Sequence, residues 1–192
     1  MTSERKKLCV YCSSRQAVVE RYGPLADELA EFLAREKMEL VFGGSFVGLM
    51  KSIASACSER GVRVTGVIPK FMAERGIGFL DADELIVSGD MRERKAAMER
   101  LADAFLAFPG GVGTLDEFAE ILSLKSLDQN RKPLVLLDPD GFYEPLVRFF
   151  EAMVEREFAK PNLRRLYYRA QSIDDMAEYL HSFVAEEAEP KW

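Results

Sequence analysis

The chain has 192 residues, which suits one large domain or two small ones, and no linker-like stretch divides it. Its net charge of -6 and its lack of a dense basic run argue against a nucleic acid polymer or an anionic membrane as the main partner. No apolar stretch approaches the roughly 18 residues of a membrane span, and the first residues lack the long apolar segment of a signal peptide. We therefore expect a cytoplasmic protein.

Short apolar runs alternate with helical patterns along the chain. The first strand is predicted at 8–12, and Gly23-Pro24 marks the start of a helix that continues through Leu33. Further strands are predicted at 39–42, 62–68, 85–87, 104–108, 133–137 and 167–170. Further helices are predicted at 49–60, 91–102, 115–127, 142–157 and 173–184, whereas 70–83 has no strong period and is predicted as short helix and loop.

This alternation predicts a doubly wound α/β fold. We expect a single Rossmann-like domain over 1–184, with a parallel sheet of about seven strands and helices on both faces. Residues 185–192 are predicted to form a flexible acidic tail.

The three cysteines and the single histidine do not favour metal or redox chemistry. Cys9 and Cys12 have CxxC spacing, but in a predicted strand an odd separation points the two side chains to opposite faces. His181 falls on a late amphipathic helix, where a surface or packing role is the simpler interpretation. We therefore expect no metal site.

Ligands of doubly wound folds bind at the carboxyl ends of the strands, where the strand order reverses. The turns after the first, second and fifth predicted strands are polar or rich in glycine, and we expect them to build one site. The second of these turns, Gly43-Gly44-Ser45-Phe46-Val47-Gly48, matches the dinucleotide fingerprint poorly and does not follow the first strand. A dehydrogenase is therefore a disfavoured interpretation.

The turn after the fifth strand carries the strongest signal, Pro109-Gly110-Gly111-Val112-Gly113-Thr114-Leu115-Asp116-Glu117. Its glycines allow a ligand to approach the backbone, and the free N–H groups at the start of the next helix favour a phosphate. Two interpretations of Glu117 stay open. Its carboxylate either completes a capping box with Thr114 or takes part in chemistry beside the phosphate.

The helix after this turn is predicted to bury Leu115, Phe118, Ala119 and Leu122, with Glu117 at the margin of the buried stripe. Leu124 is predicted to be exposed on the same side as Glu117, which suggests a partner subunit near the site.

The preceding helix places Arg94 inside its apolar stripe and Lys95 at the edge of that stripe. A guanidinium on an inward face needs an anion. One interpretation is a structural salt bridge, with Glu84 or Asp90 as the partner. The other is that Arg94 and Lys95 reach the glycine turn and hold a phosphorylated substrate or the transition state.

These two motifs together resemble the Lonely Guy family of cytokinin riboside monophosphate phosphoribohydrolases, some of which have been labelled lysine decarboxylases. The segment 109–117 matches the family's PGGxGTxxE motif, and Met91-Arg92-Glu93-Arg94-Lys95 is similar to its MxxRK helix. The similarity covers nearly the whole chain, through Cys12-Ser13-Ser14, Gly43-Gly44 with Gly48-Leu49-Met50, Gly66-Val67-Ile68-Pro69, Lys132-Pro133 and Gly141-Phe142-Tyr143.

The resemblance implies hydrolysis of the N-glycosidic bond of a nucleoside 5'-monophosphate, without metal or organic cofactor, by a homodimer with its site near the interface. It implies Arg94 and Glu117 as the catalytic residues. The expected substrate-binding residues are Ser14, Gly43, Gly44, Glu84, Met91, Lys95, Gly110, Gly111, Gly113, Thr114, Asp116 and Ser123.

The chain departs from the family pattern at Ser13, Ser45 and Gly76, and in the segment Leu122-Ser123-Leu124-Lys125-Ser126. These positions affect loops near the base and the expected dimer contact more than they affect the phosphate turn. We therefore expect AMP in preference to a prenylated cytokinin nucleotide. The departures also leave an alternative open, a non-catalytic carrier for a nucleotide or for a phosphorylated cofactor such as the molybdenum cofactor.

Overall fold

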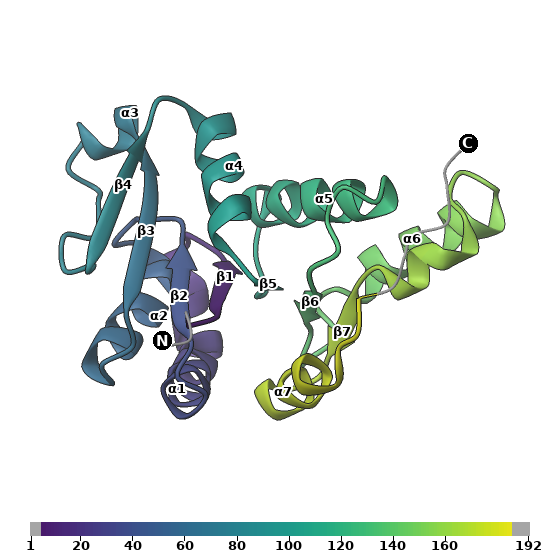
Figure 1. Ribbon diagram of the computed structural model, residues 1–192, viewed down its shortest axis with the longest axis horizontal. Coiled ribbons are helices and arrows are strands. Elements are labelled where there is room, and N and C mark those ends of the chain that lie inside the picture. Colours follow the sequence, from purple (N-terminus) through teal and green to yellow (C-terminus); the bar gives the residue numbers. More distant parts are fainter. Residues whose placement is uncertain (1–4, 186–192) are drawn as a thin grey trace.

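The computed structural model describes residues 5–185 and shows a single α/β domain around one parallel sheet of seven strands (Figure 1). The strands are β1 (Lys7–Tyr11), β2 (Glu39–Phe42), β3 (Val64–Pro69), β4 (Glu84–Ser88), β5 (Ala104–Ala107), β6 (Leu134–Leu137) and β7 (Tyr168–Ala170). The helices in the described part are α1 (Val19–Arg35), α2 (Gly48–Glu59), α3 (Lys70–Ala73), α4 (Met91–Leu101), α5 (Val112–Ser126), α6 (Glu144–Glu155) and α7 (Ile173–Ser182), with 3-10 turns η1 (Gln16–Val18) and η2 (Pro161–Arg165). Between residues 5 and 185, no helix has the length and apolar character needed to cross a membrane.

The predicted fold class is confirmed, and every predicted strand lies within two residues of an observed one. The start of α1 was predicted wrongly, because the helix begins at Val19 and includes Pro24. Proline lacks an N–H and leaves the carbonyl four residues earlier without its helical partner. Pro24 and Glu20 are both exposed, so water can satisfy that carbonyl. Apart from Ala185, the predicted tail at 185–192 lies outside the described residues.

The sheet has the order β4-β3-β2-β1-β5-β6-β7, with all neighbouring strands parallel. The chain runs outward from β1 to β4 and then crosses to the other side of β1, where β5 begins the second half. The strand order therefore reverses between β1 and β5. In doubly wound folds a ligand crevice opens at such a point, outside the carboxyl ends of the strands.

Helices cover both faces of the sheet, and the alternation along β1 shows how each face is filled. Leu8 and Val10 pack in the core under α1, α2 and α7, whereas Cys9 and Tyr11 pack in the core under α4, α5 and α6 (Figure 1). These four side chains are at most 3% exposed. Fully burying a large apolar side chain stabilises a fold by about 1.5–3 kcal/mol, so both cores hold the crevice rigidly.

Candidate active site

The glycine turn joins β5 to α5 at the carboxyl edge of the sheet, beside the point where the strand order reverses. Gly111 is the N-cap of α5, and the Leu115 N–H donates to its carbonyl at 3.0 Å. By helix geometry the N–H groups of Val112, Gly113 and Thr114 have no acceptor within the helix. They form the positive end of the helix dipole, which is an anion-binding arrangement.

The capping-box interpretation of Glu117 is wrong. Helix α5 begins at Val112, three residues before the predicted start, so Thr114 lies inside the first turn and cannot be the N-cap. The carboxylate of Glu117 bonds to Arg94 instead of a backbone N–H. The capping pattern misled because Gly111, without a side chain, occupies the cap position.

The buried hydroxyl of Thr114 is a second indication of an anion-binding site. Its side chain is 3% exposed, and Oγ1 has no hydrogen-bond partner among the residues that the structure describes. The hydroxyl lies against Gly110, where a Cβ would come within 2.1 Å of Oγ1. Buried polar atoms are nearly always hydrogen-bonded, so an acceptor or donor from a bound anion would complete this site.

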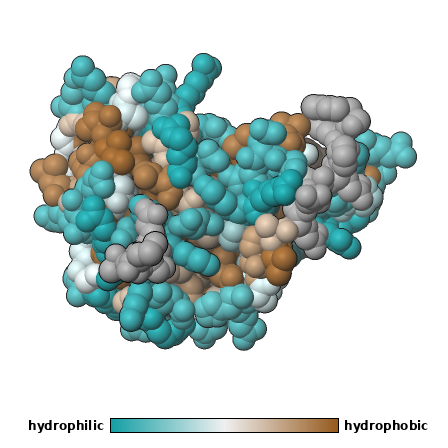
Figure 2. Space-filling view, in the orientation of Figure 1, coloured by the Kyte–Doolittle hydropathy of each residue, from teal (hydrophilic) through white to brown (hydrophobic). Residues whose placement is uncertain are grey.

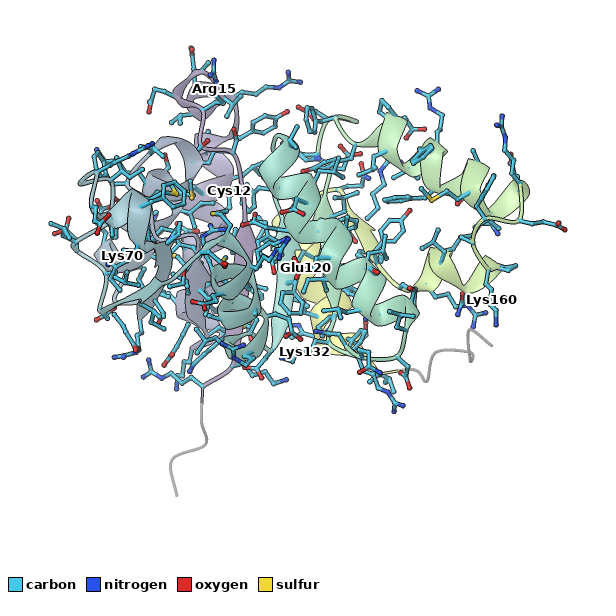
Figure 3. All side chains as sticks on the ribbon, turned by 90° about the horizontal axis from the view of Figure 1, so that it is seen from above. Cys12, Arg15, Lys70, Glu120, Lys132 and Lys160 are labelled. Carbon is cyan, nitrogen blue, oxygen red and sulfur yellow. The ribbon has the colours of Figure 1, made fainter. Side chains whose placement is uncertain are left out.

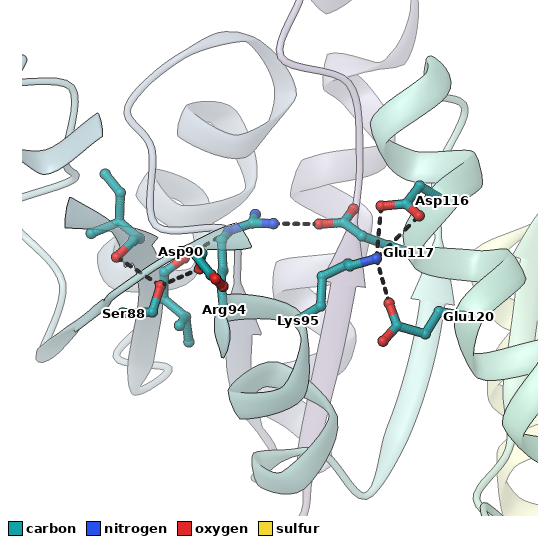
Figure 4. Close-up of polar contacts among 9 residues, drawn as sticks. Ser88, Asp90, Arg94, Lys95, Asp116, Glu117 and Glu120 are labelled. Atoms are coloured by element: carbon teal, nitrogen blue, oxygen red, sulfur yellow. Dashed lines mark hydrogen bonds and ion pairs between the residues drawn. The ribbon is translucent and has the colours of Figure 1, made fainter. Parts of the chain in front are cut away.

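Arg94 and Glu117 form a buried ion pair (Figure 4). Nη1 of Arg94 donates to Oε1 of Glu117 at 2.7 Å, and Nε donates to the Val67 carbonyl at 3.0 Å. The Arg94 side chain is 8% exposed and that of Glu117 is 10% exposed. A charged hydrogen bond of this length between groups shielded from water fixes both side chains firmly.

Two features of the sequence position this pair. Gly43 leaves space for the guanidinium, because a Cβ there would lie 2.1 Å from Nη2 of Arg94. Asp90 is the N-cap of α4 and accepts the N–H groups of Arg92 and Glu93, so it starts the helix that carries Arg94. Asp90 is therefore not the partner of Arg94.

The electrostatics of Glu117 suit acid–base chemistry. Burial raises the pKa of its carboxyl above the ordinary value, and the positive charge of Arg94 acts in the opposite direction. A carboxyl with a raised pKa can exchange a proton closer to neutral pH than an exposed one. Burial also raises the pKa of the Cys12 thiol, and the charge of Glu117 adds to that effect. A thiol held in this form is a poor nucleophile.

Lys95 bridges the two helices at the rim of the site (Figure 4). Its ammonium contacts Asp116 at 2.9 Å and Glu120 at 2.5 Å. Its partial burial acts to lower its pKa, but the hydrogen bonds to Glu120 and Asp116 raise the pKa overall. Lys95 therefore presents a permanent positive charge beside the glycine turn.

Two groups that bond to Arg94 and Lys95 were not predicted from the sequence. The Val67 carbonyl accepts from Arg94, and no side-chain pattern could have indicated a backbone acceptor on another strand. Glu120 follows Asp116 by four residues, which places both carboxylates on one face of α5, and that spacing could have indicated a lysine partner.

Seen from above, Glu120 and Cys12 lie toward the middle of the molecule, whereas Lys70 and Lys160 lie toward opposite ends (Figure 3).

Most of the predicted substrate-binding residues gather at the carboxyl edge of the sheet. Ser14 lies in the exposed turn after β1, and its backbone contacts the start of α2 at Gly48. Met91 begins α4 and is 41% exposed. The remaining residues at this edge belong to the turns and helices described above, namely Gly43, Gly44, Lys95, Gly110, Gly111, Gly113, Thr114 and Asp116.

Glu84 and Ser123 do not join them. Glu84 is the first residue of β4, so it lies at the amino edge of the parallel sheet, where it pairs with Arg63 at 3.3 Å. Ser123 lines a groove between α5 and α6, together with Phe150 and Met153. Ser123 follows Glu117 by six residues and lies on another face of α5. Neither Glu84 nor Ser123 therefore lies with the other predicted residues, and their roles in substrate binding stay predictions.

The predicted buried stripe of α5 was also partly wrong. Leu115 is 40% exposed, and Leu124 is partly buried against the core, so Leu124 gives no sign of a partner subunit. The buried side of α5 instead includes Thr114, Glu117 and Lys125. Hydrophobicity alone could not show this, because the ion pair with Arg94 takes a place that an apolar residue would otherwise fill.

The fold and the site define a Rossmann-like α/β protein with a helix N-terminus prepared for an anion and a buried Arg–Glu pair beside it. Within residues 5–185, no group of three or more His, Cys, Asp or Glu side chains is arranged to hold a metal ion. A family model described as "Possible lysine decarboxylase" matches residues 50–181.

Curated relatives identify the family more closely. The chain is 36% identical to the cytokinin riboside 5'-monophosphate phosphoribohydrolase LOG5 of Arabidopsis thaliana, over 94% of this chain and 79% of the relative. It is also 36% identical to the phosphoribohydrolase LOG of Oryza sativa subsp. japonica, over 96% of this chain and 76% of the relative. The chain therefore belongs to the Lonely Guy (LOG) family of phosphoribohydrolases, whose members are hydrolases.

Among solved structures, the molybdenum cofactor binding protein from Rippkaea orientalis is similar, with a TM-score of 0.70 and 21% identity over 94% of this chain and 98% of that one. At this identity the similarity shows a shared fold.

Proposed function

We propose that this protein hydrolyses the N-glycosidic bond of a nucleoside 5'-monophosphate and releases the free base and ribose 5-phosphate. The observation that carries the proposal is the buried ion pair between Arg94 and Glu117 beside a helix N-terminus that is prepared for an anion. Family membership supports the reaction class, because the relatives are named as cytokinin riboside 5'-monophosphate phosphoribohydrolases.

The glycine turn would hold the 5'-phosphate of the substrate. The N–H groups of Val112, Gly113 and Thr114 offer donors, and the unpartnered Thr114 hydroxyl offers one more. The ammonium of Lys95 lies nearby, where Asp116 and Glu120 hold it. Anchoring the phosphate fixes the ribose against the rest of the site, which lowers the entropic part of the barrier.

Glu117 would act on the attacking water. Cleavage of a glycosidic bond passes through a state with oxocarbenium character, which a nearby carboxylate stabilises. The ion pair engages Oε1, so Oε2 remains to accept a proton from water as the water oxygen bonds to C1' and the bond from C1' to the base breaks. The base leaves with the electron pair of that bond and takes up a proton from solvent. Arg94 would keep the carboxylate oriented and ionised despite its burial, since its charge opposes the rise in the pKa of Glu117.

The identity of the base requires a separate proposal. We propose AMP as the first substrate to test, with isopentenyl-AMP as the matched cytokinin nucleotide. Purified protein incubated with each monophosphate and with the corresponding nucleoside should release base from a monophosphate at least about tenfold faster than from its nucleoside. No release from any monophosphate, together with tight nucleotide binding, would contradict hydrolysis and favour a carrier.

We also propose a homodimer. Val112 is 84% exposed and Leu115 and Met91 are about 40% exposed, so apolar side chains are exposed in the first turns of α4 and α5. A second apolar area lies over α3 and β4, where Phe71, Leu80 and other large side chains are exposed (Figure 2). Light scattering after gel filtration should give twice the chain mass of 21.7 kDa. A monomer at micromolar concentration would contradict the dimer.

A further inference from the structure

Tyr143 connects the loop after β6 to the glycine turn. The residue lies just before α6 and is 6% exposed. Its hydroxyl donates to the carbonyl of Phe108 at 2.6 Å. The backbone of Gly110 lies close enough to the phenol to lower its pKa, against the larger opposite effect of burial. The hydroxyl therefore holds the backbone at Phe108, directly before Pro109, where β5 leads into the glycine turn.

A buried network holds Tyr143 itself in place. Its backbone N–H donates to Oδ1 of Asp138 at 3.0 Å, and Asp138 is fully buried. The other carboxylate oxygen of Asp138 accepts from Nε and Nη2 of Arg169 on β7, at 2.8 and 2.6 Å. The chain of contacts runs from β7 through Asp138 to Tyr143 and ends at the glycine turn. Two charged hydrogen bonds to one oxygen of a buried carboxylate make this arrangement rigid.

This contact affects the direction of the free N–H groups. The glycines of the turn have a wide range of accessible backbone angles, so the turn alone does not fix one geometry. A ligand that takes several N–H donors at once needs them to converge on one position. The hydroxyl of Tyr143 removes that freedom at Phe108, three residues before the N-cap Gly111.

We infer that Tyr143 is a positioning residue that sets the geometry of the glycine turn for a sugar phosphate, a role that rests on the proposed function. It does not touch the reacting atoms. Its loss should weaken binding of the phosphate group and leave the Arg94–Glu117 pair intact, because that pair is held by α4 and the Val67 carbonyl.

The test compares Tyr143→Phe with Tyr168→Phe. The control also loses one phenol hydrogen bond, since the Tyr168 hydroxyl donates to Asp175 at 2.6 Å, but it lies on β7 beside α7. The probe is ribose 5-phosphate, measured by titration calorimetry on the full chain. We expect its Kd to rise at least about fivefold in Tyr143→Phe and to change less than about twofold in Tyr168→Phe.

Hydrogen exchange supplies a second readout that a general loss of stability would not produce. Amides at 110–114 should exchange faster in Tyr143→Phe, whereas amides of β1 and β2 should stay as slow as in the unmodified protein. An unchanged Kd and unchanged exchange at 110–114 would overturn the inference. So would an equal loss of affinity in Tyr168→Phe.

The two proposals can fail separately. If the unmodified protein binds ribose 5-phosphate and Tyr143→Phe weakens it, but AMP is not cleaved, hydrolysis fails and the positioning role stands. If AMP is cleaved while Tyr143→Phe binds ribose 5-phosphate normally, the positioning role fails and hydrolysis stands.

Discussion

Adding one methyl group at Gly43 should disable the site although no charged residue is replaced. In Gly43→Ala the new Cβ would lie 2.1 Å from Nη2 of Arg94, whereas ordinary contact begins near 3.4 Å. The guanidinium must therefore retreat by about 1.3 Å. Met50 is also close, with Sδ at 2.9 Å, but a flexible thioether moves at low cost.

This displacement is large compared with the contact that it disturbs. The Arg94–Glu117 hydrogen bond is 2.7 Å long, and a retreat of about 1.3 Å takes it beyond hydrogen-bond range. A misplacement of about 1 Å in a catalytic group can cost about 100-fold in rate. We expect kcat/KM for a monophosphate substrate to fall about 100-fold, and the free energy of unfolding to fall by about 1–3 kcal/mol from overpacking.

Steady-state kinetics and chemical denaturation of Gly43→Ala check both values. Gly23→Ala is the control, because its Cβ meets nothing closer than 3.8 Å inside α1. The control should keep its rate and gain about 0.5–1 kcal/mol. In an Arg94→Lys background the atom that clashes is absent, so Gly43→Ala should add less than about threefold. A normal rate in Gly43→Ala, or an equal penalty in both backgrounds, would refute the steric argument.

Four further predictions concern single side chains. A Cβ at Gly113 meets no described atom within 4 Å, so Gly113→Ala should stay folded, yet it should raise the KM for AMP at least about tenfold by crowding the phosphate; an unchanged KM would place the phosphate elsewhere. Thr114→Val removes a buried hydroxyl without a described partner, so it should stabilise the fold by about 1 kcal/mol and weaken ribose 5-phosphate binding in calorimetry. The pKa of Glu117 is raised by burial, so its carboxyl carbon in the free protein should titrate by NMR above the ordinary value of 4.5, and a midpoint at or below 4.5 would contradict the electrostatic account. Burial lowers the pKa of Lys125 to about 8. Between pH 8 and 10.5 the folded protein has therefore released a proton that the unfolded chain still holds. The free energy of unfolding should rise across that window by on the order of 1–3 kcal/mol relative to Lys125→Met.

The sheet could be predicted because each strand is a short apolar run with glycine or polar residues after it. The strand at 39–42 was placed without error, and its turn at Gly43-Gly44 was placed at the correct edge. Local sequence fixes such features, since both the burial of a strand and the turn that ends it depend on neighbouring residues.

The partners of charged residues could not be predicted in the same way. Arg94 was expected to be buried, and it is, but its partner was sought at Glu84 and Asp90 and proved to be Glu117. The two residues are brought together where side chains of α4 and α5 meet, a tertiary arrangement that neither helix pattern contains. The same contact occupies the Glu117 carboxylate that the capping interpretation would have placed on a backbone N–H.

The catalytic role of Glu117 can be measured by following both products of the proposed reaction. Unmodified protein and Glu117→Gln are each incubated with AMP or isopentenyl-AMP, and free base and ribose 5-phosphate are quantified together. We predict equal amounts of the two products from the unmodified protein, and a rate lower by about 10²–10⁴ in Glu117→Gln, which should still bind the nucleotide. If the unmodified protein releases no more base than Glu117→Gln, Glu117 is not catalytic and the assignment of this site is wrong.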